Sequence, residues 1–239
     1  MNYLRFLKKI KNKLNLFIQK TQSKDISKIF DKIYVDKLWG KDELEDRLFS
    51  GEGSYDPKLT DNYVKVIEDF LLSLNNPSVL DLGCGDFEVG KRLIPYIFKY
   101  IAADVSSLVI EQNKKRFSET DVKFIHLDAS SNELPSVDLI IVRQVLQHLS
   151  NDDIEKTLDK IKLSKSRFLC VTEHLPVNQD FIPNADKPTG VGIRLGLGSG
   201  VDIEKYPFNF PSKSCTELSN IQTIAEGLES RLVTKLYLL

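Results

Sequence analysis

The 239-residue sequence has few cysteines and lacks long apolar runs. Its three cysteines, Cys84, Cys170 and Cys215, are far apart and form no CxxC pair. Structural zinc is therefore not expected, and the odd number argues against a secreted disulfide scaffold. No run approaches the roughly 20 apolar residues that cross a bilayer, and residues 14–18 are too few and too polar for a signal peptide. We therefore expect a cytoplasmic protein.

A large net charge is also missing, because 33 Lys and Arg residues oppose 34 Asp and Glu residues. The balance hides an asymmetry. Residues 1–28 contain eight basic residues and one acid, which gives this segment a charge of +7 and leaves −8 for the rest. A body this acidic is not expected to bind nucleic acid through its main surface.

The basic segment has apolar residues at helical spacing, among them Leu4, Leu7, Leu14 and Phe17. Two interpretations stay open. The helix packs its apolar stripe on the body, or residues 1–28 bind a protein partner or the inner face of an anionic membrane. We expect residues 1–57 to form a helical N-terminal extension and cap, and residues 58–239 to form the main domain.

The periodicity of the chain predicts an α/β protein. Residues 26–49 continue the helical pattern, residues 50–54 form a small flexible loop, and a helix runs from about residue 56 to residue 75. Short apolar runs then alternate with helical stretches, which is typical of a doubly wound, mostly parallel Rossmann-like sheet. The runs are residues 79–82, 100–103, 122–125, 137–142 and 168–172, and the helical stretches are 87–98, 106–119 and 144–163.

Two further segments complete the predicted fold. Residues 183–213 are rich in Pro and Gly and are expected to form an ordered loop over the C-terminal edge of the strands. Residues 219–225 and 232–238 read as strands, with turn residues Glu226 and Gly227 between them. They predict an antiparallel hairpin at the sheet edge, which brings the sheet to seven strands.

The most specific motif is the segment Val79–Phe87, in which an apolar strand leads into a glycine turn. Gly83 and Gly85 suit a sharp turn that approaches a ligand closely, and the following helix start offers free N–H groups. A dinucleotide fingerprint would need glycine at position 88, where Glu88 stands. The carboxylate of Asp81, two residues before the first glycine, can instead hold a cationic amino group.

Two more acids follow the next predicted strands. Asp104 ends the second strand, where a carboxylate can accept both ribose hydroxyls. Asp128 follows the third strand, where it can accept a hydrogen bond from an exocyclic adenine amine. Together with Asp81, these acids suit a ligand that carries amine, ribose and adenine groups.

These motifs resemble those of the class I S-adenosylmethionine-dependent methyltransferase superfamily. The matching segments are residues 79–85, 104–105, 128–129 and 138–149. The resemblance implies that S-adenosylmethionine is the cofactor and S-adenosylhomocysteine the product. It implies cofactor contacts for Asp81, Gly83, Cys84, Gly85, Asp104, Val105, Asp128, Ala129 and Arg143. Many members have a third glycine where Phe87 stands, and we expect Phe87 to narrow the pocket without removing the turn.

The chain also resembles a narrower group of small bacterial methyltransferases associated with capsule and surface-glycan synthesis. The shared segments are Ser50–Ser54, His148–Ser150 and Pro207–Pro211. This resemblance implies an acceptor that is a small molecule or a glycan or nucleotide-linked precursor.

The candidate catalytic residues are His148 and His174, which follow the fourth and fifth strands where an acceptor approaches. Either could remove a proton from an acceptor hydroxyl; the alternative for His148 is a helix-start histidine bonded to backbone. His126 is expected to pack within the third strand. No metal site is expected, and Cys84 reads as a small turn residue rather than a nucleophile.

Three residues, Gln144, Asn178 and Arg194, are predicted to contact the acceptor. Arg194 could receive an anionic group, or be a solvated loop arginine, and Asn178 could be a plain turn former. The sequence thus favours S-adenosylmethionine-dependent O-methylation. The alternatives are a nicotinamide-dependent oxidoreductase and a non-catalytic scaffold that binds a partner through the basic segment.

Overall fold

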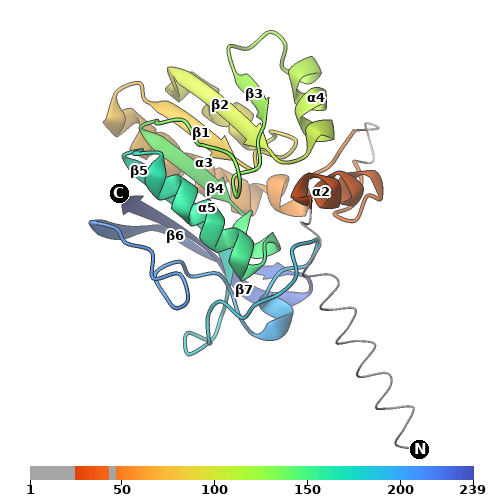
Figure 1. Cartoon of the computed structure of the whole chain (residues 1–239), viewed down its shortest axis with the longest axis vertical. Coiled ribbons are helices and arrows are strands. Elements are labelled where there is room, and N and C mark those ends of the chain that lie inside the picture. Colours follow the sequence, from red (N-terminus) through yellow and green to blue (C-terminus); the bar gives the residue numbers. More distant parts are fainter. Residues whose placement is uncertain (1–24, 43–46) are drawn as a thin grey trace, which may run out of the picture.

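The computed structural model describes residues 25–42 and 47–239 (Figure 1). Most of the basic N-terminal segment, residues 1–24, lies outside the described residues, so its predicted helix and its partners stay predictions. Within the described part of the chain, no helix has the length and hydropathy needed to cross a membrane.

The described residues form a seven-stranded sheet in the order β3-β2-β1-β4-β5-β7-β6. The first five strands in the chain are parallel, and β7 is antiparallel to both β5 and β6. The strands are β1 Ser78–Leu82, β2 Lys99–Asp104, β3 Lys123–His126, β4 Leu139–Arg143, β5 Phe168–Pro176, β6 Ser214–Ala225 and β7 Leu228–Leu238. This confirms the predicted doubly wound sheet and its C-terminal hairpin.

The direction of winding reverses at β1, which has β2 on one side and β4 on the other. In a sheet of this kind the turns after β1 and β4 diverge at the C-terminal edge and leave a crevice there. The fold therefore places the predicted motif residues, which follow β1, β2, β3 and β4, around a single opening.

Helices cover both faces of the sheet (Figure 1). They are α2 Ile26–Val35, α3 Pro57–Leu74, α4 Ser107–Arg116 and α5 Asn151–Leu163. Side chains of a strand alternate between faces, so Leu80 of β1 packs in the cluster that contains Ile154 of α5, whereas Val79 packs in the cluster that contains Ile67 of α3. The core thus consists of two apolar layers separated by the sheet.

Polar residues fix the starts of three helices. The side chains of Asp56, Ser106 and Ser150 each accept a hydrogen bond from a backbone N–H in the first turn of α3, α4 and α5. Such a cap contributes about 1 kcal/mol. Helix α3 ends at Leu74, because the backbone of the next residue, Asn75, is left-handed at φ +56° and Pro77 follows shortly after.

Two predicted helices are wrong in extent. The pattern over residues 26–49 ends as a helix at Val35, because the chain turns with left-handed φ at Lys37 and Gly40. The expected helix over 87–98 is only a short 3₁₀ helix over Gly90–Tyr96, which contains Pro95. Proline lacks the N–H that an α-helix needs.

The third helical stretch, 144–163, is divided. A 3₁₀ turn over Leu146–His148 comes first, and α5 begins at Asn151 after Ser150 has capped it. The left-handed backbone of Gln144, at φ +56°, separates the turn from β4. Within this turn Leu146 packs in the apolar core, whereas Gln147 and His148 line the cavity described below.

Phe87 does not narrow the pocket as predicted. Its backbone is left-handed at φ +65°, and its ring is fully buried in the core, with centroids 5.0–5.3 Å from those of Tyr100, Phe117 and Phe124. The left-handed conformation costs a residue with a side chain about 1–2 kcal/mol, which burial of an aromatic ring offsets. A Cβ atom on Gly90 would lie 2.4 Å from the Phe87 ring and 2.8 Å from the Tyr100 hydroxyl.

We expect Gly90→Ala to lower the free energy of unfolding by about 1–3 kcal/mol, because the added methyl group overpacks a core that cannot yield. Urea denaturation measures the change. The matched control is Gly196→Ala, since a Cβ atom there meets nothing within 4 Å. Equal stability of the two variants would contradict this account of Phe87.

Candidate functional site

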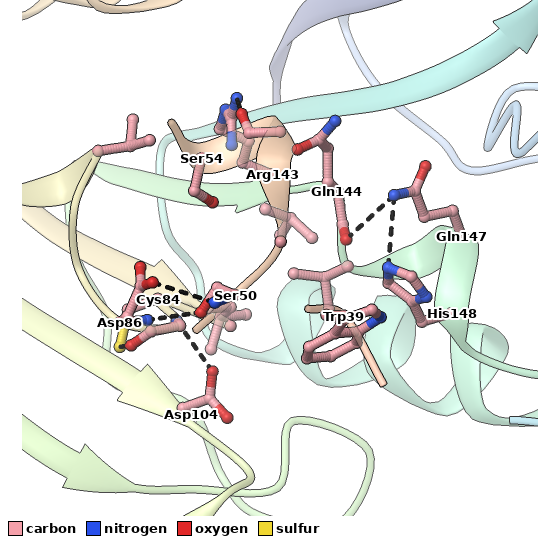
Figure 2. A pocket seen from close by; sticks show the side chains of 18 of the residues that line it. Trp39, Ser50, Ser54, Cys84, Asp86, Asp104, Arg143, Gln144, Gln147 and His148 are labelled. Atoms are coloured by element: carbon pink, nitrogen blue, oxygen red, sulfur yellow. Dashed lines mark hydrogen bonds between the residues drawn. The ribbon is translucent and has the colours of Figure 1, made fainter. Parts of the chain in front are cut away.

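A cavity of about 550 Å³ opens at the C-terminal edge of the sheet. It is lined by the turns that follow β1, β2, β3 and β4, by α2 and the loop after it, and by parts of the 183–213 segment and the β6–β7 turn. Its volume lies in the range of small-molecule sites. Figure 2 shows the side chains that converge on it.

The glycine turn after β1 forms one wall, and two glycines are sterically required there. Gly83 and Gly85 have φ values of +75° and +55°. A Cβ atom on Gly83 would lie 2.3 Å from Val145 Cγ2, and one on Gly85 would lie 2.4 Å from Ser50 Oγ. Cys84 between them lines the cavity, and burial raises the pKa of its thiol well above the usual value. A protonated thiol is a poor nucleophile.

The three predicted acids come together around the cavity. Asp104 is buried and accepts hydrogen bonds from the backbone N–H groups of Gly85, at 3.0 Å, and Ser106, at 2.8 Å. Burial raises its pKa to about 6, although these two hydrogen bonds act in the opposite direction. Asp81 is also buried, accepts from the Tyr100 hydroxyl at 3.1 Å, and has a pKa raised by burial to about 7.

Asp128 lines the same cavity and is half-buried. Its Oδ1 accepts from the backbone N–H of Ser130 at 2.8 Å and from the Ser130 hydroxyl at 2.7 Å. The predicted residues Val105 and Ala129 line the same part of the cavity. The three acids therefore lie along one wall in the order of their strands.

Arg143 at the end of β4 is the one arginine among the described residues that line the cavity, and no lysine lines it. Its Nη2 donates to the carbonyl of Gly53 at 2.7 Å, and its guanidinium carbon lies 5.0 Å from the centre of the Tyr63 ring. Its Nε is buried and has no hydrogen-bond partner in the described part of the protein. A buried donor without a partner is costly, which suggests that a ligand acceptor belongs beside it.

The segment before α3 is fastened to the glycine turn. Ser50 Oγ accepts from the backbone N–H of Asp86 at 2.7 Å, while the backbone N–H of Ser50 donates to the Asp86 carboxylate at 3.0 Å. The Tyr55 hydroxyl donates to the same carboxylate at 2.8 Å. Sequence reasoning missed Ser50 and Asp86 as a pair, because nothing in the order of residues shows that they meet.

Helix α2 covers the same wall. Ile26, Phe30 and Tyr34 line the cavity, and Asp31 accepts hydrogen bonds from the hydroxyl groups of Ser106, at 2.6 Å, and Ser107, at 3.3 Å. The described part of the predicted N-terminal extension thus closes one side of the cavity.

A second group of side chains forms the other end of the cavity, where amides and imidazoles replace carboxylates. Gln144 Nε2 lies 2.7 Å from His174 Nε2, and His174 Nδ1 lies 3.2 Å from Ser230 Oγ. Both ring nitrogens of His174 are therefore engaged within the protein. Burial, together with the positive charge of Arg143, lowers its pKa to about 4.

His148 lines the cavity beside Trp39, and Figure 2 shows the two rings side by side, with centroids 5.1 Å apart. Burial lowers the pKa of His148 to about 4, and the charge of Lys187 contributes. Trp39 also donates from Nε1 to the carbonyl of Val191 at 3.5 Å, joining the N-terminal segment to the 183–213 loop. Trp39 is the single tryptophan of the sequence. Its rarity is the one feature of the sequence that could have drawn attention to this residue.

Three interpretations from the sequence need correction. Arg194 is only 1% exposed and lies outside the cavity lining, with its donors bound to protein oxygens. Asn178 is exposed away from the cavity and accepts from the backbone N–H of Asp180, which makes it a turn former. His126 is exposed rather than packed, and its Nε2 lies 2.9 Å from the carbonyl of Val105.

Across residues 25–42 and 47–239, no group of three or more His, Cys, Asp or Glu side chains is arranged to hold a metal ion.

Comparison with known proteins identifies the domain. A family model described as a methyltransferase domain matches residues 79–163. Curated relatives described as uncharacterized methyltransferases, from Mycobacterium tuberculosis and Mycobacterium bovis, are 31% identical over 88 residues. The match covers 35% of this chain, and the chain spans about 43% of the relatives' length.

Solved structures share the fold at low identity. The N-methyltransferase NodS from Bradyrhizobium japonicum, in complex with S-adenosylhomocysteine, is 15% identical with a TM-score of 0.57, over 81% of this chain and 93% of that one. Magnesium protoporphyrin IX methyltransferase from Synechocystis, with S-adenosylmethionine bound, is 14% identical with a TM-score of 0.56, over 91% and 99%. Residues 79–163 thus match a methyltransferase domain, and the chain shares the fold of methyltransferases whose structures hold S-adenosylhomocysteine or S-adenosylmethionine.

Proposed function

We propose that the protein transfers a methyl group from S-adenosylmethionine to a hydroxyl group of a small, uncharged acceptor of the sugar or glycan-precursor type. The observation that carries the proposal is the division of one cavity into two ends. Buried carboxylates line one end, and neutral amides, imidazoles and an indole line the other. The first end suits a cationic nucleoside cofactor, and the second suits a neutral acceptor.

The residues present fit the cofactor. The turn at Gly83 and Gly85 has no room for side chains, so its backbone can approach a ligand closely. The Nε of Arg143, buried without a partner, suits the α-carboxylate of the cofactor, and the carboxylate of Asp81 suits its α-amino group. These two opposite charges at the end of β1 and β4 match the zwitterion of an amino acid.

The remaining acids fit the nucleoside. We assign the ribose hydroxyls to Asp104 and the exocyclic adenine amine to Asp128. Asp104 is already oriented by two backbone N–H groups, which leaves the outward lone pairs of its oxygens for hydroxyl donors. The apolar side chains of Val105, Ala129 and Phe30 suit the faces of the adenine ring.

When bound, S-adenosylmethionine supplies a methyl group that is already activated on a sulfonium. The chain's residues then have to hold the acceptor at attacking distance and keep water out. Helix α2 and the segment fastened by Ser50 and Asp86 close the cofactor end, and Trp39 with Val191 closes the acceptor end.

We assign the general base to His148. Its lowered pKa keeps the imidazole neutral at physiological pH, so it can accept the hydroxyl proton as charge develops. His174 has both nitrogens engaged and orients Gln144 instead. Glu52 and Glu226 also line the cavity, and these acids would repel an anionic acceptor. The basic side chains near this end are Arg143 and Lys187, whose charges act on His174 and His148. The capsule or surface-glycan role rests on the sequence resemblance.

Arg143→Gln should weaken binding of S-adenosylhomocysteine about tenfold, because one charge-assisted hydrogen bond is lost. Isothermal titration calorimetry measures the change. Methylthioadenosine, which lacks the amino-acid portion, is the matched ligand and should bind both proteins alike. An equal loss for both ligands would place Arg143 elsewhere in the site.

Affinity for S-adenosylhomocysteine should fall as the pH decreases from 8 to 5. Asp81 and Asp104 bind the ligand as carboxylates, and their pKa values of about 7 and about 6 mean that protons compete in this range. Below its pKa, each group lowers affinity by up to about tenfold per pH unit. Calorimetry across this range tests it. Asp81→Asn should remove the part of the decline that begins near pH 7 and make the profile less steep below it, and a flat wild-type profile would contradict the assignment.

His148→Gln should reduce methyl transfer by about 10²–10⁴-fold, the usual contribution of a general base, while binding of S-adenosylhomocysteine is retained. The assay uses S-adenosylmethionine with a labelled methyl group and a panel of neutral sugars beside their phosphates. The control is His126→Gln, because His126, the last residue of β3, is exposed and does not line the cavity. Faster transfer to the phosphates than to the neutral sugars would refute an uncharged acceptor.

A further inference from the structure

Two buried side chains, one acidic and one basic, hold the short turn that carries His148. The first is Glu173 on β5, which is 3% exposed. Its Oε1 accepts from the backbone N–H of Leu146 at 2.8 Å, and its Oε2 accepts from that of Gln147 at 3.1 Å. Both oxygens of one carboxylate therefore bind the first N–H groups of the 3₁₀ turn.

The second is Arg194, in the 183–213 segment, which binds the carbonyl groups of the same turn. Its Nη1 donates to the carbonyls of Leu146, at 3.2 Å, and Gln147, at 3.1 Å, and its Nη2 donates to that of Leu149 at 2.7 Å. Nη2 also donates to Asn151 Oδ1 at 2.9 Å. Glu173 thus binds the donors of this turn and Arg194 binds its acceptors.

Arg194 also joins the turn to the loop above it. Its Nε donates to the carbonyl of Ala185 at 2.9 Å. Nearby, Lys187 Nζ and the backbone N–H of Gly190 both donate to the carbonyl of His148, at 3.1 Å and 2.9 Å. The loop that places Val191 beside Trp39 is therefore attached to the backbone of His148 itself.

Folding alone does not require this arrangement. A short turn can satisfy its backbone groups in water, whereas a buried carboxylate and a buried guanidinium each lose solvation. The two side chains instead set the orientation of the turn, because a guanidinium presents five N–H donors in a fixed plane. The orientation of the turn is then set by both neighbours at once.

We propose that Glu173 and Arg194 are positioning residues, which fix the Leu146–Leu149 turn so that Gln147 and His148 face the acceptor end of the cavity. The proposal rests on the function assigned to that cavity. It gives Arg194 a role different from the anion contact predicted from the sequence, and it gives Glu173 a role that the sequence did not suggest.

The three histidines of the chain allow a test that needs no acceptor. In the protein saturated with S-adenosylhomocysteine, NMR follows the imidazole resonances of His126, His148 and His174 against pH. His148→Gln assigns its own signal, and the exposed His126 serves as an internal reference. The charged groups around His148 are Lys187 on the loop, and Glu173 and Arg194 on the two sides of the turn.

The variants are Arg194→Lys and Glu173→Gln, with Arg231→Lys as the matched control. Arg231 also donates from Nε to a backbone carbonyl, that of Pro176, but on β7 away from the turn. A lysine keeps the charge but supplies one point donor in place of the fork. In both test variants the His148 titration midpoint should rise by about one pH unit or more as the turn admits water, with the His126 midpoint unchanged.

Affinity for S-adenosylhomocysteine separates the possible results. If it stays within about twofold of the wild-type value while the His148 midpoint moves, Glu173 and Arg194 act on the acceptor end alone, as proposed. If the His148 signal is unchanged in both variants, or moves equally in Arg231→Lys, the positioning role is refuted. If the wild-type protein does not bind S-adenosylhomocysteine, the proposed function fails, and the His148 titration still tests the turn.

Discussion

The carboxylate of Asp104 is the contact on which the site depends. It ends β2 and accepts hydrogen bonds from Gly85 in the glycine turn and from Ser106 at the start of α4. Three elements that are separate in the chain therefore meet at one buried charge. Because a buried carboxylate is costly unless its lone pairs are satisfied, these two hydrogen bonds hold the glycine turn and the helix start beside the end of β2.

Two neighbouring segments, α2 and the segment before α3, are held by hydrogen bonds to the same region. The hydroxyl of Ser106 both caps α4 and donates to Asp31, so α2 is aligned with the same helix start. On the other side of the glycine turn, Ser50 and Asp86 exchange two hydrogen bonds and fasten the segment before α3. The cover of the cofactor end is thus assembled from polar contacts to backbone groups, which have fixed directions, rather than from apolar packing alone.

Burial shifts the pKa values at the two ends of the cavity in opposite directions. Carboxylates at one end hold raised pKa values because they are buried together, and imidazoles at the other end hold lowered pKa values for the same reason. Burial favours the neutral form of every group. A cationic cofactor reverses this for the acids, whereas neutral histidines are already suited to accept a proton. One physical effect therefore prepares both halves for different tasks.

The sequence by itself determined the sheet, its hairpin and the order of Asp81, Asp104 and Asp128 along the edge, because strand periodicity and glycine placement are local properties. It also indicated the methyl donor, through motifs at successive strand ends. Only the tertiary structure decided what Phe87, Arg194 and Trp39 do. Phe87 turns its ring into the core, Arg194 binds carbonyls of a turn about 45 residues earlier in the chain, and Trp39 meets His148 across more than 100 residues. A side chain's type limits the partners it can take, but which partner it meets depends on contacts between segments that are distant in the chain.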